Sequence, residues 1–225
     1  MISVHHPPHR VLEADITAYL VEAGYAVESA TFHDTYAPDM AALLKRRNSP
    51  TALYLRARAD RVAVHRTRPV EFEWEAKTHL SATRHDLTVE LFPLLLHRLH
   101  ARVGVACLYC CRIRGQDVGC WADRLPIPTV MRPAGRPHRA AWERSLVEQF
   151  APDARLIDLA TCVGSGDPFV LIPEATWRTW DDWRTMIDAL IPEEVHREPT
   201  DWRGGTTEQL FNQKRLDFGG QSRIL

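Results

Sequence analysis

LYLRARADRVAVHRTRPVEFEWEAKT, residues 53–78, decides the fold of this chain, because it combines two strand patterns with acidic residues at set places. In its second half, residues 70, 72, 74 and 76 are apolar, whereas residues 71, 73, 75 and 77 are charged. Since strand side chains alternate between faces, this predicts a half-buried strand with one charged face. Carboxylates roughly 6 to 7 Å apart on that face repel each other unless a cation lies among them. The stretch therefore predicts a metal site.

The first half of the stretch predicts two strand segments separated by a bend. Leu53–Arg58 alternates, Val62–His65 continues the pattern, and Asp60 lies in or beside the bend. Lys77, two residues after Glu75, is one of only three lysines among the 28 basic residues. A compact ammonium with a tunable pKa differs chemically from a guanidinium, so a lysine is informative in a chain that otherwise uses arginine.

The flanking segments predict a helix and strand before this stretch and a helix and strand after it. Apolar spacing and Gly24 predict a helix over Arg10–Ala23, after a polar leader whose histidines we expect to be mobile. A short strand follows at Tyr25–Thr31. Thr78 or Ser81 is expected to cap a helix that reaches about Ala101 and is kinked or split by Pro93, and Val103–Ile113 is short and apolar like a buried strand.

Composition divides the rest of the chain. Residues 123–138 contain four prolines and a glycine, which is typical of a linker or surface arm. We therefore predict a core over 1–122, a small α/β extension over 139–200 packed on that core, and a flexible tail or partner-contacting arm over 201–225. The predicted elements of the extension are a helix over 138–150, strands over 154–160 and 169–172, and a tryptophan-bearing helix over 174–190.

The charges are segregated along the chain although the net charge is −1. Residues 42–69 hold eight basic residues against one acid, and residues 145–203 hold five against twelve. A basic half that carries the metal motif suits a phosphate backbone. Five cysteines, four of them around one buried strand, indicate reduced core thiols and a cytoplasmic setting, and no apolar run is long enough for a membrane span.

Asp60, followed by Glu75-Ala76-Lys77, resembles the PD-(D/E)xK nuclease superfamily, and the predicted element order of residues 10–115 is similar as well. The resemblance implies a restriction-endonuclease-like α/β core, which consists of a helix, a mixed central sheet with a metal-binding hairpin, a helix and a strand. Glu13 falls where Holliday-junction resolvases keep a helical glutamate. Ala59 departs from the pattern by standing in place of the proline of the family name.

By this resemblance the chain is expected to be a Mg²⁺-dependent DNA endonuclease. Asp60, Glu75 and the Ala76 carbonyl would hold Mg²⁺, with Mn²⁺ able to substitute, and Lys77 would orient or help deprotonate the attacking water. Glu73 would be an auxiliary ligand and Glu13 a further metal or water ligand. Four arginines near the motif are the candidate contacts to DNA phosphates, namely Arg56, Arg58, Arg61 and Arg84.

Two alternatives stay open at this point. The fold could serve a non-catalytic nucleic-acid-binding or structural assembly protein, of a virus or mobile element, whose tail joins a homodimer or larger assembly. The chain could instead be an interaction module in which the charged strand is a solvated edge and the tryptophan-bearing helix binds protein. Motifs for nucleotide-binding loops and serine hydrolases are missing from the sequence.

Overall fold

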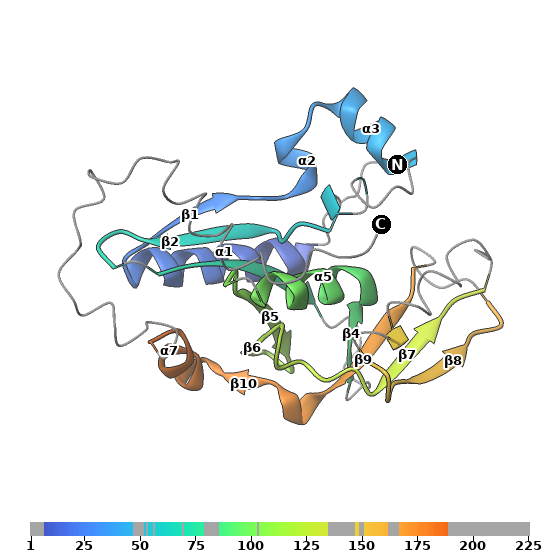
Figure 1. Ribbon diagram of the computed structural model, residues 1–225. Helices are drawn as coiled ribbons and strands as arrows, with labels where there is room; N and C mark the ends of the chain where they lie inside the picture. Colours follow the sequence, from blue (N-terminus) through green and yellow to red (C-terminus); the bar gives the residue numbers. More distant parts are fainter. Residues whose placement is uncertain are drawn as a thin grey trace, which may run out of the picture. The chain divides into compact units, whose positions relative to one another are not determined.

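The computed structural model describes residues 7–46, 52, 54–55, 57–68, 70–78, 86–102, 104–134, 147–148, 151–161 and 167–188. The predicted fold class is confirmed, because these residues form a mixed α/β structure around a mixed central sheet (Figure 1). The expected tail over 201–225 lies outside the described residues. Among those described, no helix is both long and apolar enough to cross a membrane.

Among the described residues, the central sheet has six strands in the order β1-β2-β3-β5-β6-β10, in which the β3–β5 pair is parallel and the other pairs are antiparallel. The parallel pair requires a crossover, and α5 supplies it. The strands are β1 (Tyr25–Ser29), β2 (Arg61–His65), β3 (Glu71–Thr78), β5 (Cys107–Ile113), β6 (Gln116–Trp121) and β10 (Arg178–Thr179).

Helix α1 (Pro7–Glu22) covers one face of this sheet, where it contacts β1 and β3. Its apolar stripe, Leu12, Ile16 and Leu20, is completely buried, as the helical period predicts. The helix begins before the expected Arg10, because prolines are tolerated in a first turn that has no intrahelical partner for their missing N–H groups. It ends before Gly24, whose φ of 93° suits glycine.

The other face of the sheet packs against α5 (Leu91–Ala101) and a second sheet. Cys107, Tyr109 and Cys111 of β5 share one buried cluster with Leu94 and Leu95 of α5. The second sheet has the order β4-β9-β7-β8 and contributes Leu87, Val89, Val130, Val170 and Ile172 to this cluster. Its strands are β4 (Asp86–Glu90), β9 (Phe169–Pro173), β7 (Thr129–Arg132) and β8 (Arg155–Asp158).

The long helix predicted from Thr78 or Ser81 to Ala101 is wrong over the described residues 86–90. Leu87 and Val89 are buried while Thr88 and Glu90 are exposed, which is the period of a strand, and this segment pairs with β9 as β4. The helix begins only at Leu91. Pro93 therefore lies in the first turn and does not kink the helix, because no hydrogen bond is expected from its position there.

The strand predicted over Leu53–Arg58 is also wrong, because the described residues Ala52, Tyr54 and Leu55 are helical. The pairing of β2 with β1 begins at Arg61, opposite Ser29, and no described residue between these two is part of a strand. Asp60 lies in a bend, as predicted. Two short helices, α2 (Phe32–Thr35) and α3 (Pro38–Arg46), connect β1 to this region, and α2 occupies a segment that carries no helical period.

The C-terminal elements match the predictions in part. Strand β8 falls within the expected 154–160 and β9 at the expected 169–172, whereas β7 lies inside the segment read as a linker. The helix expected over 174–190 consists of a 3₁₀ turn, η1 (Glu174–Thr176), the short strand β10 and helix α7 (Trp180–Asp188). The predicted boundary at 122–123 stays a prediction, and most of the helix expected over 138–150 lies outside the described residues.

Candidate metal centre

Asp60 and Glu75 are brought together by the antiparallel pairing of β2 and β3. The register places Arg61 opposite Trp74, so the bend at Asp60 lies beside Glu75. The backbone N–H of Asp60 donates to Oε2 of Glu75 at 3.0 Å, and the N–H of Ala76 donates to Oδ2 of Asp60 at 2.8 Å. Each carboxylate thus accepts a backbone hydrogen bond from the other strand segment, which fixes both side chains.

The tight turn between β2 and β3 fixes this register. Nδ1 of His65 accepts the backbone N–H groups of Thr67 at 3.2 Å and Arg68 at 3.0 Å. The N–H of His65 itself donates to the Val70 carbonyl at 2.8 Å, which closes the loop. A one-residue slip would turn Glu75 to the opposite face of β3, so the turn helps to determine the site.

Lys77 lies two residues beyond Glu75 on the same face of β3. Its Nζ donates to Oε1 of Glu75 at 2.6 Å and lies 3.8 Å from Oε2 of Glu90 at the end of β4. Burial lowers the pKa of Lys77, but Glu75, Glu90 and Asp60 together raise it above the ordinary lysine value. The amine of Lys77 is therefore protonated, and it carries a positive charge and donates hydrogen bonds.

Negative charge accumulates around Asp60. Burial and the neighbouring Glu75 carboxylate raise the pKa of Asp60 well above its usual range, and Glu13 adds to the rise. Lys77 and the N–H of Ala76 act in the opposite direction without cancelling it. A carboxylate with such neighbours is stabilised in its charged form by a bound cation, and oxygen donors are the ligands that Mg²⁺ prefers.

Glu13 reaches this region from α1. Its carboxylate lies 3.7 Å from Nε of Arg61 and 3.9 Å from Nε2 of His9. A metal ion could be held by three side chains, since one ligand atom from each lies within 4.8 Å of the others, namely His9, Glu13 and Asp60. The prediction of a mobile leader is wrong for His9, which lies in α1. Its four-residue spacing from Glu13 is the signal that places both side chains on the same helical face.

A cavity of about 620 Å³ opens beside Glu13 and Arg61. Arg10, Thr17 and Thr31 also line it, and none of the three was predicted as a site residue. A guanidinium and hydroxyl groups next to carboxylates suit a phosphate diester whose reacting group is held by a metal ion. Of the other arginines predicted to contact DNA, Arg58 is half-buried, whereas Arg56 and Arg84 lie outside the described residues.

Glu73 is on the same strand face as Glu75 but contacts different residues. Its Oε2 lies 3.6 Å from Nδ1 of His100, and one of its oxygens lies within 4.8 Å of ligand atoms of His97 and Cys107. The two histidines come from α5, where a simple helical pattern gave no reason to select them. Only the packing of α5 on the sheet brings them to Glu73.

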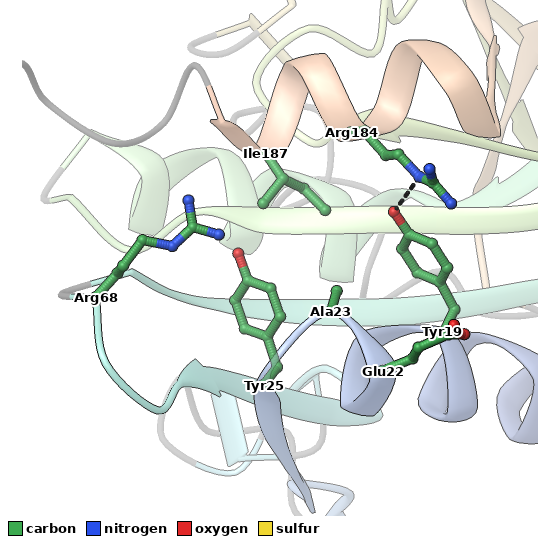
Figure 2. A pocket seen from close by; sticks show the side chains of 7 residues that line it. All are labelled: Tyr19, Glu22, Ala23, Tyr25, Arg68, Arg184 and Ile187. Carbon is green, nitrogen blue, oxygen red and sulfur yellow. Dashed lines mark hydrogen bonds between the residues drawn. The ribbon is translucent and has the colours of Figure 1, made fainter.

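A second cavity, of about 340 Å³, lies between α1 and α7 (Figure 2). In Figure 2, Arg184 reaches over Tyr19, and its Nε donates to the tyrosine hydroxyl at 2.9 Å. Trp180 packs edge-on against the same tyrosine at a centroid distance of 4.6 Å. Tyr25, which lines this cavity, is at the end of β1 opposite to the Asp60 bend, so we do not associate this cavity with the carboxylates.

Comparisons with known proteins give little further help. No family model matches the chain, and no curated protein matches it. Among solved structures, the chain is similar to Archaeoglobus fulgidus Hjc, described as a Holliday junction resolvase from an archaeal hyperthermophile, with a TM-score of 0.33 and 15% identity over 52% of this chain and 75% of that one. This similarity is too low to support a conclusion about activity, which must rest on the geometry of the site.

Proposed function

We propose that this protein is a metal-dependent DNA endonuclease of the PD-(D/E)xK type. The observation that carries the proposal is the reciprocal bonding of Asp60 and Glu75 across β2 and β3, with the Lys77 ammonium 2.6 Å from Glu75. Asp60, Glu75 and the carbonyl of Ala76 would hold Mg²⁺, or Mn²⁺ in its place. When bound, such an ion polarises the scissile phosphate and stabilises developing negative charge.

The remaining residues would orient the substrate and the water. Lys77 would act as a positive charge and hydrogen-bond donor, since the neighbouring carboxylates raise its pKa. It would hold the attacking water or a phosphate oxygen on the side of Glu75. Glu13 would accept a hydrogen bond from water, while Arg10 and Arg61 at the cavity beside it would contact the DNA backbone. Hydrolysis of one phosphodiester bond would leave a nick.

Cleavage assays on linear, circular, single-stranded and branched DNA, each with Mg²⁺, Mn²⁺ or EDTA, test the proposal. We expect cutting of at least one substrate with either metal ion and none with EDTA. Lys77→Ala and Glu75→Gln should each reduce the cutting rate at least about 100-fold, which is typical of a lost group that stabilises developing charge. Glu71→Gln is the matched control, because Glu71 is exposed at the start of the same strand and should leave the rate unchanged.

A non-catalytic role would give a different result in the same experiment. A DNA-binding or assembly protein with this fold would bind DNA in a salt-dependent manner, cut none of the substrates, and bind equally well after Asp60→Asn and Glu75→Gln. Metal-independent cutting, or full cutting by Lys77→Ala, would also defeat the endonuclease proposal. The suggested homodimer or larger assembly through residues 201–225, and the cytoplasmic setting, stay predictions.

A further inference from the structure

Glu73, Cys107 and His97 meet on the face of the central sheet that α5 covers. Glu73 and Cys107 are direct partners in the parallel β3–β5 pairing, so their side chains are neighbours on one face. His97 is completely buried on α5, which packs over this face. One ligand atom from each of the three side chains lies within 4.8 Å of the others. The fold thus gathers a carboxylate, a thiol and an imidazole from three elements.

The hydrogen bonds of His97 leave one ring nitrogen unused. Nδ1 is 2.8 Å from the hydroxyl of Tyr109, while Nε2 is buried without a hydrogen-bond partner. Donation by Nδ1–H to the tyrosine oxygen leaves the lone pair on Nε2, as in histidines that bind a metal through Nε2 and are held by a partner at Nδ1. An unsatisfied buried polar atom costs about 1 to 3 kcal/mol, so a partner for Nε2 is expected.

Two neighbouring polar atoms are likewise buried without a hydrogen-bond partner. Oε2 of Glu73 and Nδ1 of His100 are both buried and make no hydrogen bond, and they lie 3.6 Å apart. His100 follows His97 by three residues, which places both imidazoles on one side of α5. A single ion among these atoms would satisfy several of them together, whereas a water molecule would leave the thiol as a weak partner.

We propose that Glu73, His97 and Cys107 form a second metal site, which binds Zn²⁺ or a similar transition-metal ion, with His100 as the fourth ligand. The donor set selects the ion, since thiolate and imidazole suit Zn²⁺ and disfavour Mg²⁺. Binding replaces the S–H bond of Cys107 by a sulfur–metal bond and releases the thiol proton to solvent. With four protein ligands the site is closed, and its role is structural.

This site does not depend on the proposed nuclease activity, although the two sites are close in the chain. Glu73 precedes Glu75 by two residues on β3, and the ion would tie β3 and β5 to α5. It would therefore hold the strand that carries Glu75 and Lys77 in register. The carboxylate ligands around Asp60 would bind Mg²⁺, whereas the thiolate and imidazole ligands around Cys107 would bind Zn²⁺.

Cobalt titration of the metal-free full-length chain tests the proposal. Co²⁺ occupies zinc sites, and a cysteine ligand gives a thiolate-to-metal charge-transfer band in the near ultraviolet. We expect this band to saturate at one equivalent of Co²⁺, to disappear when Zn²⁺ is added, and to persist in excess Mg²⁺. Cys107→Ala should abolish the band, and His97→Gln should weaken Co²⁺ binding at least about 10-fold.

Two controls separate this site from its surroundings. Cys110→Ala removes an equally buried thiol on the other face of β5 and should leave the band unchanged. Asp60→Asn should also retain it, so the result is distinct from that of the nuclease proposal. Absence of the band in the unaltered protein, or its persistence in Cys107→Ala, would overturn the proposal. If Cys107→Ala does not fold, Glu73→Gln takes its place, and unchanged Co²⁺ affinity in that variant and in His97→Gln overturns it equally.

Discussion

Asp60 lies in surroundings that disfavour its charged form. Its carboxylate is placed beside Glu75 by hydrogen bonds of 3.0 and 2.8 Å that run between the two strand segments, and Glu13 adds negative charge from α1. Placing these acids together lowers the stability of the metal-free protein, because the carboxylates repel each other. The repulsion favours a cation, so stability and metal binding should be linked at this residue.

Asp60→Asn should make the metal-free protein more stable at neutral pH. Burial and Glu75 raise the pKa of Asp60, so the folded state retains a proton that the unfolded chain has lost. The contribution of Asp60 to stability is therefore most favourable below the unfolded pKa of about 3.9 and falls as pH rises towards the folded pKa. The Asp60→Asn protein has no such loss. Its free energy of unfolding at pH 7, measured by urea unfolding in EDTA, should therefore be roughly 1 kcal/mol higher.

Magnesium should reverse the order of these two proteins. It should raise the unfolding midpoint of the unaltered protein, because an ion that binds only the folded state stabilises it, and should have little effect on Asp60→Asn. A gain from Asp60→Asn that is the same at pH 4 and pH 7 would contradict the electrostatic explanation. An equal response of both proteins to Mg²⁺ would place the ion elsewhere.

Helix α1 joins the core to the candidate metal centre. Leu12, Ile16 and Leu20 anchor it, and Asp15 accepts a hydrogen bond from Arg112 of β5 at 2.6 Å. Glu13 follows the first of these anchors directly in the chain. The position of the Glu13 carboxylate therefore depends on how the apolar stripe packs.

Leu12→Ala should lower the free energy of unfolding by about 2 to 5 kcal/mol, because it leaves a cavity under a helix that is fully buried at this position. Val11→Ala is the matched control, since Val11 is 51% exposed and its truncation should change stability by no more than about 0.5 kcal/mol. Urea unfolding of both variants measures the difference. Similar losses in the two variants would show that the helix does not pack through the Leu12 stripe.

At the scale of the whole molecule, charge is separated along the chain. The basic segment over 42–69 includes the bend at Asp60, and the acidic segment over 145–203 supplies β8, β9 and α7. Arg10 and Arg61 line the cavity next to Glu13. DNA should therefore bind on the side of this cavity, and its affinity should fall as salt rises.

Replacing Arg10 and Arg61 together by alanine should reduce the slope of log binding constant against log salt by about 2, since each phosphate contact contributes roughly 0.9. Binding of a short duplex in EDTA, followed over a range of salt concentrations, measures this slope. Arg155→Ala with Arg178→Ala is the control, because both residues are exposed on other strands. An equal reduction in both double variants would indicate non-specific attraction without a defined DNA surface.

Local periodicity was enough to predict the helices and strands whose burial pattern is visible within their own sequence. The alternation in β3, the stripe of α1 and the apolar run of β5 each report a buried face directly, because burial repeats every two or every 3.6 residues. The bend at Asp60 was predicted correctly as well. By contrast, Leu53–Arg58 alternates although its described residues Tyr54 and Leu55 are helical, because alternation alone does not supply a neighbouring strand to pair with.

The sequence by itself determined the mixed α/β class and supplied Asp60, Glu75 and Lys77 as candidate site residues, since strand parity alone places the last two on one face. The tertiary structure decided the residues that come from distant elements. His9 and Arg10 reach the site through the packing of α1, and His97 meets Glu73 and Cys107 only through the crossover of α5. The physical reason is that periodicity reports which face of an element is buried, whereas the neighbours of that face depend on how separate elements pack.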